Sequence, residues 1–377
     1  MPGFEVIGRE EAEATTSVFN EGGILFAHGF DSLRKKFHVR EFESNSCKYF
    51  SANYSQATQS GTSALKTALK AVGVGPGDEV ITQSFNFIAT VEAIHDCNAK
   101  PIICDVDNNL DFCLKDCLSK INKNTKAIII VHMLGIGGPI EQLVEIGKKY
   151  NIPIIEDACE IVGGKNNNGY YGCLGDIGVF SFDFGKNITC GEGGMLLTNN
   201  RKYYEYARSY TDHGHALEPK VARGNDKAIM PGFNYRMTEI QAAIGKVQLN
   251  KLENIINEHK KRYQILNNFF PNKPYIRQEL NNCRGSYDTF IFINLQDNQA
   301  NEILKILKLN NFGTKNLPDA MRWHCSYFWE HLIGEEGFKH SKKTYKILSN
   351  AIAIPIFIKR SLKEYEKLGA DLKEYFG

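Results

Sequence analysis

A lysine in an apolar setting is the most chemically suggestive feature of the sequence. Lys186 lies in SFDFGKNITCGEGG, residues 181–194, among phenylalanines at 180, 182 and 184 and before glycines at 191, 193 and 194. Apolar surroundings disfavour the charged form of an amine, and the neutral amine is the nucleophile. Glycines beside it let a ligand approach the backbone. The pattern predicts a nucleophilic lysine, and the alternative is an ordinary lysine at a strand end.

A carboxylate and a group of hydroxyls accompany this amine. Asp157 follows the apolar run IPII, and SGTSAL, residues 60–65, places Gly61, Thr62 and Ser63 at the start of a helical pattern. Free N–H groups at a helix start bind phosphate without a cationic side chain. Serine and threonine are also ordinary N-caps, so helix capping is the alternative here. For Asp157 the alternative is a cap at the end of a strand.

An amine, an acid and a phosphate cradle together suit pyridoxal 5′-phosphate. That cofactor needs a lysine to hold its aldehyde as a Schiff base and a carboxylate to keep its pyridine nitrogen protonated. The ten cysteines are scattered and include no C-x-x-C pair. We therefore expect pyridoxal phosphate as the cofactor and no metal site.

Alternating strands and helices are expected to position these groups. Apolar residues at helical spacing predict helices over 60–74, 90–99 and 139–151. Continuous apolar runs predict strands in KPIICDVD (100–107), TKAIIIVHML (125–134), IPIIEDA (152–158), IGVFSFDF (177–184) and GGMLLTNN (193–200). Such alternation predicts a mostly parallel sheet covered by helices. Ligands bind at the carboxyl ends of the strands in sheets of this kind, where Asp157 and the Lys186 segment fall.

Composition excludes several classes of function. The net charge of +2 gives no electrostatic reason to expect nucleic acid or an anionic membrane as a partner. No apolar run approaches the roughly 20 residues that span a bilayer. The acidic N-terminus lacks the basic and apolar regions of a signal peptide, so we expect a cytoplasmic protein.

Five segments resemble the DegT/DnrJ/EryC1/StrS family of sugar aminotransferases. They are SGTSALKTAL (60–69), FNFIATVEAI (85–94), EDACEIVGG (156–164), GCLGDIGVFSFDFGKNITCGEGGMLLTNN (172–200) and GFNYRMTEIQAAIGKVQL (232–249). The resemblance implies fold type I: an α/β large domain with a mostly parallel seven-stranded sheet covered by helices, and a smaller α+β C-terminal domain. We expect the large domain, with the N-terminal segment, over 1–250 and the small domain over 251–377. We expect a long helical stretch, 238–270, to bend or to connect the domains near its middle.

The resemblance also implies roles for matching positions. Lys186 matches the Schiff-base lysine, which also moves a proton between substrate and cofactor, and Asp157 matches the acid on the pyridine nitrogen. The remaining cofactor-binding positions that it implies are Gly61, Thr62, Ser63 and Ser181 at the phosphate, Phe87 on the ring face and Glu160 beside the ring hydroxyl.

A homodimer with shared active sites is a further implication. Arg236, in YRMTE, matches a segment that reaches the cofactor phosphate of the other subunit; many members have asparagine here, so the charged contact is inferred from the arginine itself. Glu192, Trp323 and His324 fall where members line the substrate site. Core packing is the alternative for Phe87 and for Trp323. The remaining candidates, His132, His213 and His215, are interpreted as structural.

Lysine at position 186 favours transamination, because the few dehydratases in this family have histidine there. The implied reaction moves an amino group from L-glutamate to a keto-sugar for a bacterial surface glycan, lipopolysaccharide or capsule. Four segments look closer to a branch with acceptors free of nucleotide, such as an 8-keto-octulosonate: MPGFEVIG (1–8), FAHGFD (26–31), YRMTE (235–239) and NLPDAMRWH (316–324). The alternatives are a nucleotide-linked 3- or 4-keto-hexose or a small phosphorylated ketone as acceptor, a pyridoxal phosphate-dependent dehydratase, and a non-catalytic cofactor-binding sensor.

Overall fold

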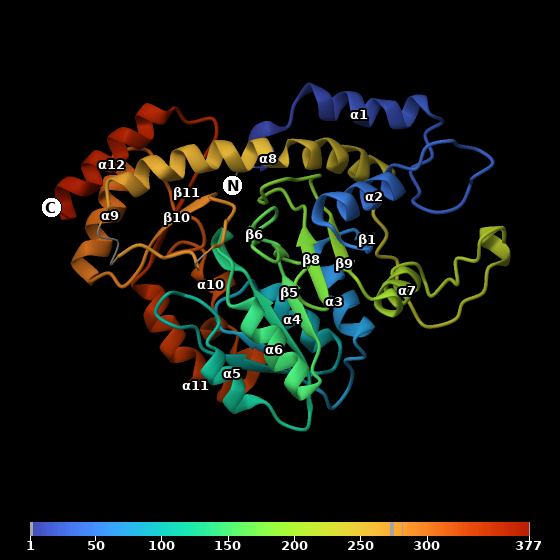
Figure 1. Cartoon of the computed structure of the whole chain (residues 1–377), viewed down its shortest axis with the longest axis horizontal. Helices are drawn as coiled ribbons and strands as arrows, with labels where there is room; N and C mark the ends of the chain where they lie inside the picture. The colour runs from blue at the N-terminus through green and yellow to red at the C-terminus, as the bar shows by residue number, and fades with distance from the viewer. Residues whose placement is uncertain (1–2, 272–274, 281, 377) are drawn as a thin grey trace.

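Seven strands form the central sheet of the computed structural model, which describes residues 3–271, 275–280 and 282–376. Their order is β1-β9-β8-β5-β4-β2-β3 (Figure 1). The strands are β1 (Tyr54–Thr58), β2 (Glu79–Gln83), β3 (Lys100–Cys104), β4 (Thr125–Val131), β5 (Ile154–Asp157), β8 (Ile177–Ser181) and β9 (Gly194–Thr198). β9 is antiparallel to both of its neighbours, and the other strand pairs are parallel. The predicted mostly parallel seven-stranded sheet is confirmed.

Helices cover both faces of this sheet because its central strands are apolar on both sides. Alternate residues of β4 point to opposite faces. Ile129 packs in one core cluster with α3 (Gly61–Ala71), α4 (Ile88–Asp96) and α7 (Arg201–Tyr210). Ile128 and Ile130 pack in another, with α2 (His38–Phe50), α5 (Leu114–Lys120), α6 (Ile140–Tyr150) and α8 (Glu239–Asn268).

The C-terminal part has its own sheet and core. β10 (Thr289–Phe292) and β11 (Ile352–Pro355) pair antiparallel. A third apolar cluster packs them against α8, α9 (Asp297–Leu309) and α12 (Leu362–Phe376), while α11 (Glu330–Ser349) lies against β3 of the large sheet. α8 runs as one long helix from α2 to α12 (Figure 1). The predicted boundary at 250/251 falls inside this helix, and the division into two domains stays a prediction.

The remaining elements are short or peripheral. They are η1 (Gly3–Val6), α1 (Arg9–Asn20), η2 (Met133–Gly135), β6 (Lys165–Asn166), β7 (Gly169–Tyr170), η3 (Arg223–Asn225), α10 (Met321–His324) and η4 (Ser326–Phe328). Of the helices within the described ranges, none has the length and apolar character needed to cross a membrane.

The parallel strands bring the predicted site residues to one edge of the sheet. β5 ends at Asp157 and β8 ends at Ser181. β1 ends three residues before Gly61, and Phe87 follows the end of β2. Because these strands run in one direction, their carboxyl ends open on the same edge, where ligands bind in such sheets.

Candidate active site

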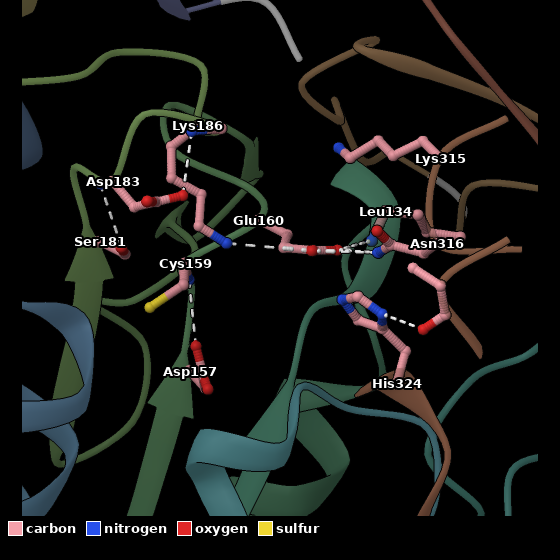
Figure 2. Close-up of polar contacts among 12 residues, drawn as sticks. Leu134, Asp157, Cys159, Glu160, Ser181, Asp183, Lys186, Lys315, Asn316 and His324 are labelled. Carbon is pink, nitrogen blue, oxygen red and sulfur yellow. Dashed lines mark hydrogen bonds and ion pairs between the residues drawn. The ribbon is translucent and has the colours of Figure 1, made fainter. Parts of the chain in front are cut away.

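Lys186 lies on the loop that joins β8 to β9. Its N–H donates to the carbonyl of Asp183 (3.0 Å), and the Gly185 N–H donates to the Asp183 carboxylate (2.9 Å), so the loop turns tightly before the lysine. The Lys186 side chain is 18% exposed, and its Nζ lies 3.9 Å from Oε1 of Glu160. Figure 2 shows the amine pointing across the site toward this carboxylate.

The phenylalanines that precede Lys186 do not surround its amine. Phe180 and Phe182 are buried in the core cluster with α2, and Phe184 is 54% exposed. Burial by itself lowers the pKa of Lys186, but the negative charge of Glu160 and of further acidic neighbours outweighs burial, so the pKa is raised. The expectation that apolar neighbours hold this amine neutral is therefore wrong.

Glu160 is the centre of a polar cluster at this edge. Its Oε2 accepts from the Leu134 N–H (2.9 Å), and its Oε1 accepts from the amide of Asn316 (3.1 Å). Burial raises the pKa of Glu160, but the charges of Lys186 and Lys315 reverse this effect and hold its pKa at about 2. Glu160 is thus a carboxylate whose position is fixed from two other segments of the chain (Figure 2).

Asp157 is a buried carboxylate at the end of β5, with 3% of its surface exposed. One oxygen accepts from the Thr90 hydroxyl (2.9 Å) and the other from the Cys159 N–H (3.2 Å). Among the residues that the structure describes, no cationic side chain forms an ion pair with Asp157. Burial of an unpaired charge is costly, so this carboxylate suits a cationic ligand group.

The start of α3 packs against the end of β8. An ideal Cβ on Gly61 would lie 2.8 Å from Cβ of Ser181, so a larger residue would close this approach. The Ser63 hydroxyl donates to the Ser60 carbonyl (2.8 Å), and the Ser63 N–H donates to the Ser60 hydroxyl (3.1 Å), which caps the helix. Thr62 is exposed at the same turn. Ser63 therefore serves at least as a capping residue, and phosphate binding at these positions stays a prediction.

Two rings lie at the outer side of the site. Phe87 is 43% exposed, and its ring centre lies 5.3 Å from that of His324. Trp323 is 56% exposed. Neither Phe87 nor Trp323 is a core residue, which leaves both open to a ligand. Nδ1 of His324 lies 2.8 Å from the carbonyl oxygen of Ala320 and must donate to it, and burial lowers the pKa of His324.

Arg236 and Glu192 form no hydrogen bond or ion pair with Lys186, Glu160 or Asp157 among the described residues, although Arg236 forms an isolated bridge with Thr58 at the end of β1 and Glu192 lies on the loop that carries Lys186. The Arg236 guanidinium pairs with Asp212, which also pairs with Arg223, and it lies over the ring of Phe26. The Glu192 side chain is exposed, and its carbonyl accepts from Gln241 (2.7 Å). The contact of Arg236 with the cofactor of a second subunit stays a prediction.

Three residues of the cluster were not predicted from the sequence. Thr90 holds Asp157 from the first turn of α4; it lies in the segment FNFIATVEAI (85–94), but the resemblance implied no role for it. Leu134 binds Glu160 through its N–H and has a left-handed φ of 58°, which is uncommon outside glycine and asparagine. Asn316 precedes Trp323 and His324 in the chain, and its only signal was its place in that loop.

Two of the three histidines interpreted as structural, His132 and His215, have polar partners. Nε2 of His132 lies 3.0 Å from Glu156, and its Nδ1 accepts from the Gly138 N–H (3.1 Å). Nδ1 of His215 lies 3.1 Å from Asp226. Within the described ranges, no group of three or more histidine, cysteine or acidic side chains is arranged to hold a metal ion.

The residues at this edge fit the cofactor expected from the sequence. The unpaired buried Asp157 suits a protonated ring nitrogen, and the close approach of Gly61 to Ser181 forms a cradle beside the free N–H groups of a helix start. Lys186 supplies the amine between them, with its Nζ beside Glu160. The charges and hydrogen-bond donors therefore match a phosphorylated, protonated pyridine ring.

Comparison with known proteins identifies similar sequences. The model of the DegT/DnrJ/EryC1/StrS aminotransferase family matches residues 30–373. The GDP-perosamine synthase of Escherichia coli O157:H7 is 38% identical over 224 residues, which cover 59% of this chain and 60% of that protein. The GDP-perosamine synthase of Vibrio cholerae is 30% identical over 312 residues, 82% of this chain and 83% of that protein. The chain thus matches about three fifths of the length of the E. coli relative.

Solved structures share the fold across nearly the whole chain. An aminotransferase from Psychrobacter cryohalolentis has a TM-score of 0.86 at 22% identity, covering 98% of this chain and 97% of that one. Helicobacter pylori PseC, an aminotransferase involved in the biosynthesis of pseudoaminic acid, has a TM-score of 0.83 at 21% identity with the same coverage. These likenesses confirm the predicted fold.

Proposed function

The chain belongs to the DegT/DnrJ/EryC1/StrS aminotransferase family, whose cofactor is pyridoxal 5′-phosphate, and we propose that it transfers an amino group from L-glutamate to a nucleotide-linked keto-hexose. The observation that carries the proposal is the convergence of Lys186, Glu160 and Asp157 at one edge of the sheet. A non-catalytic cofactor-binding sensor would not release 2-oxoglutarate from glutamate, and this release separates the two functions.

The acceptor is inferred from the curated relatives. Two are named GDP-perosamine synthase for a GDP-linked sugar, and they favour a GDP-linked keto-hexose for this chain. The comparisons give no support to the 8-keto-octulosonate acceptor that the N-terminal and 316–324 segments suggested. The nucleotide-linked keto-hexose, which was one of the alternatives, therefore replaces it. That interpretation weighed short loop segments, which vary more than the elements they connect.

Each residue of the site has a role that its surroundings support. Asp157, oriented by Thr90 and the Cys159 N–H, would hold the proton of the ring nitrogen. The start of α3 and Ser181 would bind the phosphate. Phe87 offers an exposed ring face for stacking. When bound, the cofactor supplies an electron sink that makes a carbon–hydrogen bond of the donor acidic.

Lys186 would carry out the proton transfers. Because its pKa is raised, Nζ must first lose a proton, and as the neutral amine it would take a proton from the donor carbon and return one to the acceptor. Glu160 holds that amine in place by charge. Over both halves of the reaction, glutamate becomes 2-oxoglutarate and the ketone becomes an amine, so no external oxidant or reductant is needed.

Further parts of the proposal concern the cellular setting. We propose a homodimer, a cytoplasmic location, and a product used in a bacterial surface glycan such as lipopolysaccharide or capsule. GDP in the names of the curated relatives supports an activated sugar as the product. The donor, L-glutamate, is the usual one in this family.

Isotope transfer tests the reaction directly. The purified chain with pyridoxal phosphate is given glutamate labelled at the amino nitrogen and a GDP-linked 4-keto-6-deoxyhexose, and mass spectrometry follows the label. We expect the label in the sugar nucleotide, matched by release of 2-oxoglutarate, and none with the Lys186→Ala variant. Transfer only to a nucleotide-free keto-sugar or a phosphorylated ketone would overturn the acceptor. Absence of 2-oxoglutarate would overturn the reaction.

A further inference from the structure

The N-terminal residues lie directly on the loop that carries Lys186. Gly3 is buried, and an ideal Cβ on it would lie 2.2 Å from the carbonyl oxygen of Lys186 and 3.1 Å from Cγ2 of Thr189. Next to it, the ring of Phe4 stacks on that of Phe184, with centres 5.1 Å apart and an angle of 14° between planes. Contacts this close require glycine at position 3.

The same segment is bound at its other end to the C-terminal part. Glu5 is 8% exposed, and its Oε2 accepts from the Ile358 N–H (2.8 Å). Its Oε1 accepts from the Lys359 N–H (3.1 Å). Both N–H groups belong to the turn that follows β11. A buried carboxylate that accepts two backbone N–H groups is a strong and directional contact.

α8 forms hydrogen bonds with both the lysine loop and the N-terminal residues. The Thr189 N–H donates to Gln248 of α8 (3.3 Å), and Gln248 donates to Glu11 of α1 (2.8 Å). Lys251, one turn further along, donates to the Val6 carbonyl (3.2 Å) and to Glu11 (2.6 Å). The N-terminal residues are thus packed between the lysine loop and the long helix.

We infer that residues 3–6, here called the N-terminal strap, position Lys186 and tie its loop to the turn after β11. The close approach of the strap to Lys186 is to its backbone carbonyl, and Glu5 binds the turn after β11, so Gly3 and Glu5 are positioning residues rather than catalytic ones. The position of the amine therefore depends on residues at the far end of the sequence. This inference goes beyond amino-group transfer and holds for any reaction that uses Lys186.

A substitution at Gly3 tests the strap against a matched glycine. Gly3→Ala places a methyl group against the Lys186 carbonyl and must displace one of the two. Gly75→Ala is the control, because Gly75 lies in the turn between α3 and β2, no atom lies within 4 Å of an added Cβ there, and its φ is not in the left-handed region. We expect hydrogen–deuterium exchange of the amides of 186–191 to speed up about tenfold in Gly3→Ala and to stay unchanged in Gly75→Ala. The full chain is measured with and without pyridoxal phosphate.

A second variant keeps the test decisive if Gly3→Ala does not fold. Glu5→Gln keeps the side-chain shape but turns an amide N–H₂ toward backbone donors, so it loosens the strap without a clash. We expect faster exchange at 358–359 and at 186–191 in this variant. If exchange rises at 358–359 alone, the strap does not position the lysine loop and the inference fails.

A spectroscopic measurement separates positioning from general stability. The visible absorbance of lysine-bound cofactor is titrated with pH in the wild type and in both strap variants. All samples are measured well below their thermal unfolding midpoints, and we expect the absorbance midpoint to shift in Gly3→Ala and Glu5→Gln and not to shift in Gly75→Ala. An unchanged midpoint in both strap variants contradicts the inference. No sugar acceptor enters these experiments, so failure of the proposed acceptor leaves their outcome intact.

Discussion

Nζ of Lys186 lies 3.9 Å from Oε1 of Glu160, and the two side chains reach each other from different loops at the sheet edge. Phe180 and Phe182, which precede Lys186, are buried in the core cluster with α2. Burial lowers the pKa of the Lys186 amine, and the charge of Glu160 counters this effect. The pairing means that the protonation of each group depends on the other. It also gives the active site a measurable response to pH.

The first prediction concerns Glu160 and acid stability. Its pKa is about 2 in the folded chain, below its ordinary value of 4.5, so its contribution to stability is complete above pH 4.5 and is lost as pH falls toward 2. We expect the stability difference between wild type and Glu160→Gln to shrink below pH 4.5, by up to about 1.4 kcal/mol per pH unit. Urea unfolding at a series of pH values measures this difference.

The control for this experiment is Glu92→Gln, because Glu92 is exposed on α4. The Glu92→Gln variant, measured over the same range, gives the baseline for loss of an exposed carboxylate. Lys186 contributes in the opposite sense: its raised pKa stabilises the fold fully below 10.5, and this contribution is lost as the pH rises through the folded-state value. A difference for Glu160→Gln that does not vary with pH would show that the carboxylate is not held ionised by its neighbours.

The second prediction concerns the amine itself. Lys186→Ala is expected to bind pyridoxal phosphate through phosphate and ring contacts, without the covalent link, and to lose activity by more than about 1,000-fold. Absorbance of the bound cofactor and release of 2-oxoglutarate measure the two effects. Lys202→Ala, at an exposed position on α7, is the control and should match the wild type. Wild-type turnover in Lys186→Ala would refute the assignment of the catalytic lysine.

The third prediction concerns the carboxylate at the end of β5. Asp157→Asn keeps the shape but removes the charge that would hold the ring nitrogen protonated, so we expect the half-reaction with glutamate to slow by about 100-fold or more. Thr90→Val removes one donor to Asp157 and should slow it by about tenfold. Stopped-flow absorbance measures both rates. A rate within about twofold of wild type for Asp157→Asn would leave Asp157 as a strand cap alone.

The fourth prediction concerns Arg236 and assembly. If each site takes Lys186 from one subunit and Arg236 from the other, a heterodimer of Lys186→Ala and Arg236→Ala chains has one site with both changes and one intact site. Free mixing then makes about half of the dimers mixed, and about a quarter of wild-type activity returns. Arg236 pairs with Asp212 inside its own chain, so Asp212→Asn is the variant that tests an intramolecular role. Inactive mixtures after verified subunit exchange would rule out the shared site.

Local pattern in the sequence was enough to predict the sheet and the two ends that carry Asp157 and Lys186. Strands buried on both faces contain continuous apolar runs, as in residues 127–131 of β4 and 177–180 of β8, and such runs can be recognised without knowledge of the neighbouring strands. Motifs around the strand ends then located the amine of Lys186 and the carboxylate of Asp157. The strands and these two residues could be predicted because each signal lies within one short segment of the sequence.

The contacts of Lys186 could not be predicted in the same way. Glu160 and Asn316 come from separate segments, and their distance from the amine depends on how the C-terminal part packs on the sheet. The positions of the phenylalanines before Lys186, in contrast, follow from the geometry of the strand. Side chains alternate along a strand, so Phe180 and Phe182 share a face, and Ser181 between them points to the other face, toward the site.

The reversed strand β9 has a consequence for synthesis of the chain on the ribosome. β1 lies at the edge of the sheet, and its pairing partner there is β9, with Tyr54 opposite Thr198. During translation the backbone N–H and C=O groups of β1 therefore remain without their strand partner until residue 198 has left the exit tunnel. An unpaired strand edge on a nascent chain favours association with other chains. β8 and β9, joined by the lysine loop, form a local hairpin, so the pair that frames Lys186 can form as soon as it emerges.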